Sequence, residues 1–340
     1  MNLPDLKKGT SASVAVVPQF DVDGALVAVV LIKEAFAVDR RDRVRRVGGA
    51  EVHAVDVPWD EDAPETSSIR FPSDVCVRKP ATDVVVVGSA VAAYRVRQRQ
   101  LDVTVRVGAM ERVVRVFGPR VWYRGAFGWA LSDPTDFDAL PLRWESAWGG
   151  ADFSDPSAPL EEPRNPAGRG LVRDPASLEG QLGPSIEDPR DLLETHRSRP
   201  APAGLGAVGR HFAPRRTFAG TADDRWMRER MPLPPEDFDD RFNQFAAPGL
   251  TAEGRLRGGE AVLVNNMCEQ GPMAFELPRM AFFTGARVRG ALAETPAVID
   301  TVTLVPNDRR VEITWRATLP MPRSFRSVEY IQVHEKEWRA

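Results

Sequence analysis

Three acidic residues lie near tryptophans or before a turn, in a pattern that a sugar-cleaving site could use. Glu145 lies between Trp144 and Trp148, and Glu187-Asp188 directly precedes a proline. Such a site uses one carboxyl group to donate a proton and a second to attack the sugar or activate water. The alternative is that these carboxylates accept hydrogen bonds from backbone amides or arginines and so support irregular loops, whose buried backbone must find partners. We favour this second interpretation.

Two glycine-containing segments could bind an anion through their backbone amides. They are Gly149-Gly150 and Gly168-Arg169-Gly170. An anion-binding loop of this kind usually follows a strand and opens a helix, and neither segment does so. Glycine is also the residue that most readily adopts the positive φ angles of tight turns. We therefore interpret both segments as turns.

Motifs for other chemistries are absent from the sequence. It contains no Gly-x-Ser-x-Gly nucleophile elbow and no Gly-x-x-x-x-Gly-Lys-Ser/Thr phosphate loop. The four histidines, at positions 53, 196, 211 and 334, form no His-Glu-x-x-His pair, and Cys76 and Cys268 have no zinc-like spacing. We expect two buried, reduced thiols, no metal and no cofactor.

Length and charge exclude further classes of protein. The 340 residues could form one large core or two ordinary ones, and a formal net charge of -3 creates no field that attracts nucleic acid. The first ten residues lack the apolar core of a secretory signal, and no stretch approaches the ~18 apolar residues of a membrane helix. The sequence thus predicts a cytoplasmic protein without a nucleic-acid partner and without membrane insertion.

The N-terminal part, 1–130, has the pattern of many short strands. Between 13 and 124, β-branched residues recur at every second position and turn residues separate the runs. Asp23-Gly24 separates two apolar runs, as in a tight hairpin. The run at 84–87 is apolar on both faces and predicts a central strand.

The middle stretch, 131–250, has a different character. It contains 16 of the 29 prolines, which disfavour long helices and central strands, but also the tryptophans and phenylalanines that a disordered segment lacks. We therefore predict an ordered, irregular insertion. Two short helices are expected within it, one at 222–230 capped by Thr221 and one at 235–242 that begins at Pro235.

Strand patterns return in the C-terminal part, 251–340. Runs at 262–264, 275–277 and 301–305 predict strands, and residues 311–316 alternate between apolar and polar side chains. We expect these strands to complete the β scaffold begun by 1–130. The predicted fold is mainly β, an antiparallel sandwich-like or open-barrel scaffold with a long Pro- and Gly-rich insertion and a few short helices.

Several motifs follow one another in a particular order and spacing: Lys79-Pro80-Ala81-Thr82-Asp83-Val84 with Gly88, residues 144–150, 165–170, 186–189, 226–230, 232–239, Phe242-Asn243, 246–248 and Asp300-Thr301-Val302. Together they resemble a bacterial family of uncharacterised-domain proteins encoded beside type VI secretion genes. The similarity covers nearly the whole chain, and the order and spacing of the motifs are specific although each motif alone is weak. Two positions depart from the family pattern, Ser185 before Ile-Glu-Asp and the run Phe242-Asn243-Gln244-Phe245.

The resemblance implies a non-catalytic adaptor, or chaperone, that holds a toxic effector protein in the cytoplasm. It would help to load this effector onto the secretion spike, a VgrG trimer sometimes tipped by a PAAR protein. Such a protein must cover a surface of its partner, by adding a sheet edge or by burying aromatic anchors. A carbohydrate-active hydrolase that uses Glu145 and a second carboxylate, or a structural component of the secretion apparatus, remain the alternatives.

We expect the partner-binding surface to include part of 131–250, because this stretch combines irregular backbone with aromatic residues. The candidate residues either contact the partner or support the motifs from inside. They are Trp144, Glu145, Trp148, Gly149, Gly150, Asn165, Arg169, Glu187, Asp188 and Trp226.

Overall fold

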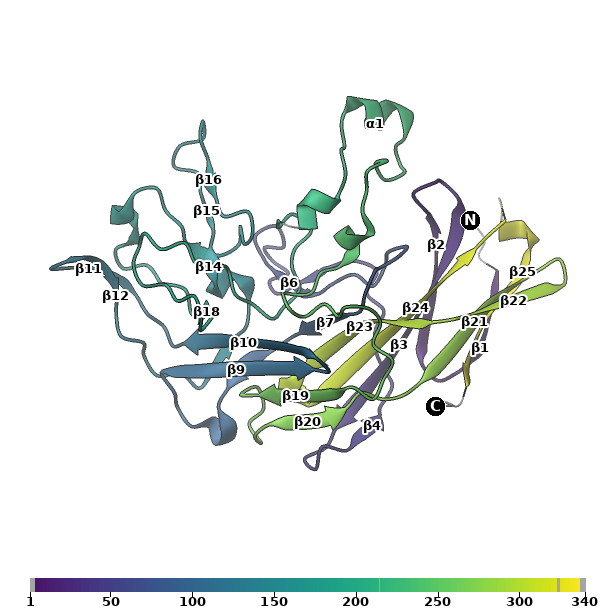
Figure 1. Ribbon diagram of the computed structural model, residues 1–340, viewed down its shortest axis with the longest axis horizontal. Coiled ribbons are helices and arrows are strands. Elements are labelled where there is room, and N and C mark those ends of the chain that lie inside the picture. Colours follow the sequence, from purple (N-terminus) through teal and green to yellow (C-terminus); the bar gives the residue numbers. More distant parts are fainter. Residues whose placement is uncertain (1–3, 214, 323–324, 337–340) are drawn as a thin grey trace.

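Strands joined by turns and irregular loops make up the fold (Figure 1). The computed structural model describes residues 4–213, 215–322 and 325–336. Several open sheets, antiparallel or mixed, surround a shared core, and one short α-helix accompanies them. The predicted mainly β class is confirmed.

The central sheet joins strands from both ends of the chain. Five strands follow the order β2-β3-β24-β23-β7, and β4 pairs with the end of β3. β7 runs parallel to β23, whereas the other pairs are antiparallel. The bounds are β2 Ser13–Phe20, β3 Leu26–Val38, β4 Val44–Arg46, β7 Asp83–Val86, β23 Val298–Val305 and β24 Arg310–Pro320.

Two further sheets pack against the central one. A five-stranded sheet has the order β18-β10-β9-β19-β20, with bounds Ile186–Glu187, Met110–Phe117, Gln100–Val107, Ala261–Asn265 and Met273–Glu276. A four-stranded sheet has the order β1-β25-β21-β22, with bounds Asp5–Gly9, Val328–Lys336, Ala281–Val288 and Ala291–Pro296. β1 is parallel to β25, so this sheet is also mixed.

Short ribbons and turns form the remaining elements. Five two-stranded ribbons pair β5 Val57–Pro58 with β6 Ile69–Phe71, β8 Ser89–Val91 with β13 Ala139–Pro141, β11 Trp122–Gly125 with β12 Gly128–Leu131, β14 Trp148–Gly149 with β17 Arg169–Gly170, and β15 Ala151–Asp152 with β16 Leu160–Glu161. The α-helix α1 spans Asp224–Glu229. Short 3-10 segments span Ala93–Arg95, Trp144–Ser146, Pro175–Leu178, Arg215–Phe218, Asp240–Asn243, Pro306–Asp308 and Phe325–Ser327.

The main core lies between one face of the central sheet and the other two sheets. Alternation along β3 and β24 points Ile32 and Trp315 toward this side. Trp315 meets Phe282 of β21 edge to face, with ring centroids 4.9 Å apart. Aromatic pairs in this geometry stabilise a core beyond the area that they bury. The core therefore ties the four-stranded sheet to the central one.

The opposite face of the central sheet is polar at its centre. Lys33 of β3 lies 3.0 Å from Asp74 Oδ2, and Arg316 of β24 lies 2.8 Å from Asp300 Oδ2. The segment at 51–80 covers this face, where Arg316 Nη2 donates to the Asp74 carbonyl. Charges taken out of water need such partners, because an unpaired buried charge is costly. This buried ionic cluster comprises Lys33, Asp74, Lys79, Asp83, Asp300, Glu312 and Arg316.

Most predicted strands of the two terminal parts are present in the structure. The Asp23-Gly24 turn joins β2 to β3 and has Gly24 at a φ of 80°. The run at 84–87, predicted to be central, is instead at the end of its sheet. Both faces are buried, because Val84 and Val86 belong to the main core and Val85 and Val87 pack with Phe245 on the other side. Residues 245–251 cover the outer edge of this run, where Val84 N donates to Leu250 O.

Both helix predictions within the middle stretch need correction. α1 is shorter than predicted and its N-cap is Asp223, whose carboxylate accepts from Trp226 N at 2.8 Å, whereas Thr221 bonds to Asp237. The helix predicted at 235–242 is wrong. Only the 3-10 turn Asp240–Asn243 forms there, because the Asp239 carboxylate caps it and the Asp239 amide donates to Phe218 O instead of continuing a helix from Pro235.

The structure also bears on the two cysteines and on the search for a membrane helix. Both cysteines are free, and Cys268 is buried as predicted, but Cys76 is only half-buried within the segment that covers the central sheet. No helix in the described part of the chain is long and apolar enough to span a membrane.

Candidate partner-binding surfaces

Asn165 lies beneath the motif at 144–150 and holds it in place. Its side chain is fully buried, and Nδ2 donates to the carbonyls of Trp144 and Trp148 at 2.9 and 3.0 Å. Trp144 is buried as well, and its indole Nε1 donates to Ala207 O at 2.9 Å. These contacts close the motif on itself, so that its two tryptophans face inward rather than toward a partner.

The motif glycines allow backbone segments to approach closely. Gly149 has a φ of 148°, and a Cβ atom there would lie 2.2 Å from Asn165 O. The amides of Gly150 and Gly168 both donate to the same Asn165 oxygen, at 2.9 and 3.1 Å. These two amides therefore have a partner within the chain, and the glycines form turns rather than an anion-binding loop.

Glu145 contacts the segment that covers the central sheet. Its two carboxylate oxygens accept from the amide and the hydroxyl of Ser68, each at 2.6 Å. Arg169 Nε donates to the Glu145 carbonyl at 2.6 Å, and burial of its guanidinium lowers the pKa of Arg169. A cavity of about 400 Å³ lies beside Glu145, and Asp60 lines it too.

Glu187 and Asp188 pair with arginines. The buried Glu187 carboxylate pairs with Arg120 and accepts from Leu193 N at 2.7 Å. Asp188 accepts from Arg190 and from Arg112, whose Nη1 lies 2.9 Å away. Hydrogen bonds from Arg190 lower the pKa of Asp188 well below its usual range. Glu187 and Asp188 therefore fix β18 and the turn after it, because their side chains accept hydrogen bonds from donors within the chain.

Trp226 belongs to an arm, residues 219–238, that projects from the body of the molecule (Figure 1), and Asp239 N donates to Phe218 O at its base. Figure 1 shows α1 at the end of this arm, away from the sheets. Trp226 Nε1 donates to Leu233 O at 2.8 Å and so closes the arm. Two methionines next to it, Met227 and Met231, are 58% and 61% exposed. The arm thus carries apolar side chains outward while Trp226 supports it from within.

A second projection is the hairpin of β11 and β12. Its tip residue Phe127 is fully exposed, and Tyr123 on β11 is half-exposed. The apolar residue Leu182 bridges to Val121 at the base of the hairpin and is also exposed. Aromatic and apolar side chains exposed together are typical of protein-binding surfaces.

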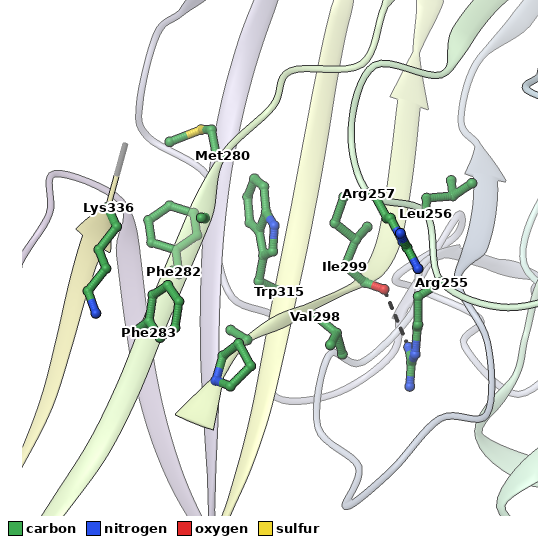
Figure 2. Close-up of a pocket in the computed structure, with 13 residues that line it drawn as sticks. Arg255, Leu256, Arg257, Met280, Phe282, Phe283, Val298, Ile299, Trp315 and Lys336 are labelled. Atoms are coloured by element: carbon green, nitrogen blue, oxygen red, sulfur yellow. Dashed lines mark hydrogen bonds between the residues drawn. The ribbon is translucent and has the colours of Figure 1, made fainter. Parts of the chain in front are cut away.

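A third feature is an apolar groove between the central and four-stranded sheets (Figure 2). Its volume is about 860 Å³. Trp315, Phe282 and Ile299 form the buried floor, and Val298 lies at the exposed rim. Further lining residues are Arg255, Leu256, Arg257, Met280, Ala281, Phe283, Pro296, Ala297 and Lys336.

A model of a family described as uncharacterized protein conserved in bacteria (DUF2169) matches residues 23–316. The chain belongs to the DUF2169 family. The expected membership in a bacterial uncharacterised-domain family is thereby confirmed. The matched range of this DUF2169 chain includes all ten candidate residues and most of the central sheet. No curated protein and no solved structure matches the chain.

The ten candidate residues of this DUF2169 chain do not form a single site. Trp144, Glu145, Trp148 and the glycines meet Asn165 and Arg169 in one packed unit, whereas Trp226 lies on the arm. The groove was not predicted, because five segments that are distant in sequence line it. The alternation in 311–316 indicates that Trp315 faces the core, but this pattern does not distinguish a core residue from one that lines a groove. Within the described ranges, no group of three or more His, Cys, Asp or Glu could hold a metal ion.

Proposed function

We propose that the protein is a non-catalytic adaptor, acting in the cytoplasm, which binds a toxic effector and assists its loading onto a type VI secretion spike. The VgrG trimer or its PAAR tip would receive the effector. The motifs shared with the family encoded beside type VI secretion genes suggest this task. Family membership is compatible with it, and the exposed apolar side chains support it.

One contrast within 131–250 carries the proposal. The motif residues turn inward, where Asn165, Glu187 and Asp188 are bonded to internal donors and acceptors. Apolar side chains of the same stretch, among them Met227 and Met231, turn outward on a projecting arm. Methionines adapt to varied apolar partners because their side chains are unbranched and flexible. A rigid interior that presents a pliable apolar surface suits a protein that holds another protein.

An adaptor of this kind binds its partner without catalysing a reaction. Burial of exposed apolar area on the arm would supply the free energy of association, at roughly 25 cal/mol per Å² before the entropic costs of binding. The arm is tied to the body, since Arg230 donates to Val22 O in the β2–β3 turn. Little ordering of the arm would then accompany binding, and pre-organised surfaces bind more tightly.

A carbohydrate hydrolase remains the second candidate because Asp60 and Glu145 line one cavity. Two carboxyl groups facing one cavity are the minimum that such an enzyme requires. Both oxygens of Glu145, however, already accept hydrogen bonds from Ser68 at 2.6 Å. A general acid must carry a proton and present it to the substrate, and this arrangement favours a supporting carboxylate instead.

A genetic experiment tests the proposal against both alternatives. We expect deletion of the gene to lower the level or delivery of the effector encoded next to it, while secretion of structural spike proteins continues. Loss of secretion of every effector would instead indicate a structural component of the apparatus. Unchanged effector level and delivery would contradict an adaptor role.

A further inference from the structure

The groove between the central and four-stranded sheets combines an apolar floor with a cationic rim. Arg255, Arg257 and Lys336 line it, and none of the described residues that line it is acidic. Figure 2 shows Lys336 beside Phe283 on one side of Trp315, with the two arginines on the other side. A ligand that fits both features must be apolar and must carry negative charge.

The three cations differ in how far they are already neutralised. Arg255 lies 3.7 Å from Asp300 and donates to the carbonyls of Lys79 and Ile299. Lys336 lies 3.6 Å from a carboxylate oxygen of Glu294. Arg257 is exposed, and among the described residues no carboxylate lies within ion-pair distance of its guanidinium. Arg257 is therefore the cation available to a ligand's carboxylate.

The position of the groove favours a polypeptide as the ligand. Its wall includes Pro296, the last residue of β22, and β22 is the outer strand of its sheet. Most residues of β22 are exposed, Leu292 among them. A chain that places an apolar side chain in the groove could continue along this free edge, as in the addition of a strand to a sheet.

We propose that this groove binds an apolar segment of the partner protein that carries an acidic side chain, which pairs with Arg257. The inference rests on the proposed function, because it names the chemistry of the segment that the adaptor holds. A side chain buried against Trp315, Phe282 and Ile299 supplies the anchor. The ion pair at the exposed rim sets orientation and adds salt dependence to association.

Cross-linking locates the occupant directly. The full-length chain carries p-benzoylphenylalanine in place of Val298, which is 39% exposed at the groove rim. The matched control carries it in place of Val55, which is 71% exposed in the segment over the opposite face of the central sheet. The partner is the purified product of the neighbouring effector gene. We expect position 298 alone to cross-link to partner residues where apolar side chains adjoin Asp or Glu.

Affinity measurements test the two parts of the site. We expect Val298→Arg and Arg257→Glu each to weaken binding of the same partner about tenfold or more, by loss of the anchor pocket and of the ion pair. Arg257→Lys should retain most of the affinity. Val55→Arg and Arg41→Glu, at exposed positions outside the groove, the arm and the β11–β12 hairpin, should leave it unchanged. Circular dichroism and thermal unfolding verify that each variant is folded.

The results of these experiments distinguish failure of the groove assignment from failure of the proposed adaptor function. If the complex forms with undiminished affinity in the folded groove variants, the groove assignment is wrong while the adaptor role stands. If position 298 cross-links only to a second copy, or to residues 337–340 that follow Lys336, the assignment is likewise overturned. A chain ending at Lys336 that binds the partner tenfold more tightly would also identify the chain's own end as occupant. If the wild-type chain binds no partner, both proposals fail.

Discussion

Lys79 Nζ lies 2.8 Å from Asp83 Oδ2, and neither side chain is exposed to solvent. Lys79 also donates to Thr301 Oγ1 at 2.9 Å and lies 3.5 Å from the centroid of the Phe245 ring. Asp83 in turn accepts from Phe245 N at 2.9 Å. Two family motifs that are far apart in the sequence, 79–84 and 300–302, therefore meet the run that ends at Phe245 at one buried ion pair, which joins β7 and β23 to the middle stretch.

Removal of one partner of this pair should strongly destabilise the fold. We expect Lys79→Met to lower the free energy of unfolding by about 3 to 5 kcal/mol, because Asp83 is left buried without its cation. The matched control Lys8→Met, at an exposed position on β1, should change it by less than about 0.5 kcal/mol. Urea denaturation measures both. A change below about 1 kcal/mol in Lys79→Met would contradict this role of the pair.

Acid should destabilise the protein partly through Asp300. Burial opposes ionisation of this carboxyl group, but attraction to Arg316 and Lys79 outweighs it and lowers the pKa to about 2. Because the folded-state pKa lies below the unfolded value near 3.9, Asp300 stabilises the fold above pH 4 and loses this contribution as the pH falls through 2. The contribution is of the order of 2 kcal/mol.

A comparison of two proteins isolates this carboxyl group. Between pH 5 and pH 2 the free energy of unfolding should fall more steeply in the wild type than in Asp300→Asn, which has no charge to lose at this position. The difference between the two decreases should approach the contribution of Asp300. Parallel pH profiles would show that Asp300 is not held ionised by its neighbours.

The close approach at Gly149 should not tolerate a side chain. A Cβ atom there meets the Asn165 carbonyl, whereas a Cβ atom at Gly128, which has a similarly positive φ of 117°, meets nothing within 4 Å. We expect Gly149→Ala to lower the free energy of unfolding by at least about 2 kcal/mol more than Gly128→Ala. Thermal or urea unfolding gives both values. Equal losses would show that the backbone angle alone selects glycine at Gly149.

Glu145 provides the test of the hydrolase alternative. In Glu145→Gln one carboxylate oxygen becomes an amide that cannot accept from Ser68, so we expect a loss of about 1 to 3 kcal/mol in stability and no loss of partner affinity. Asp60→Asn is measured beside Glu145→Gln, because Asp60 is the other acidic residue that lines the same cavity. Glycoside turnover by the wild type that is abolished in folded Glu145→Gln would favour the enzyme.

Local sequence patterns were sufficient to predict most strands but not their arrangement. Alternation in 311–316 and the Asp23-Gly24 turn depend on near neighbours, and both appear as expected. β7 lies at the end of its sheet because it pairs with β23 alone, and residues 245–251 cover its other edge; both partners lie far along the chain. Long-range pairing of this kind leaves no periodic signal in the strand itself.

The sequence allowed prediction of those parts of the candidate site that are formed by residues close together in the chain. Residues 144–150 and 165–170 were recognised together, and they contact each other through Asn165. The partners of Lys79 could not be inferred, since Phe245 and Thr301 approach it only in the folded state. The groove floor at Trp315 was likewise hidden, because a core-facing residue and a groove-lining residue have the same sequence pattern.

The most direct test of an adaptor role is the interaction of the purified protein with the product of the adjacent effector gene. Size-exclusion chromatography with light scattering, with and without the VgrG spike protein, should reveal a stable complex of defined mass. The complex should weaken about tenfold in Met227→Asp or Met231→Asp and persist in Val55→Asp. Absence of any complex between the folded wild-type proteins, with or without VgrG, would contradict the adaptor role.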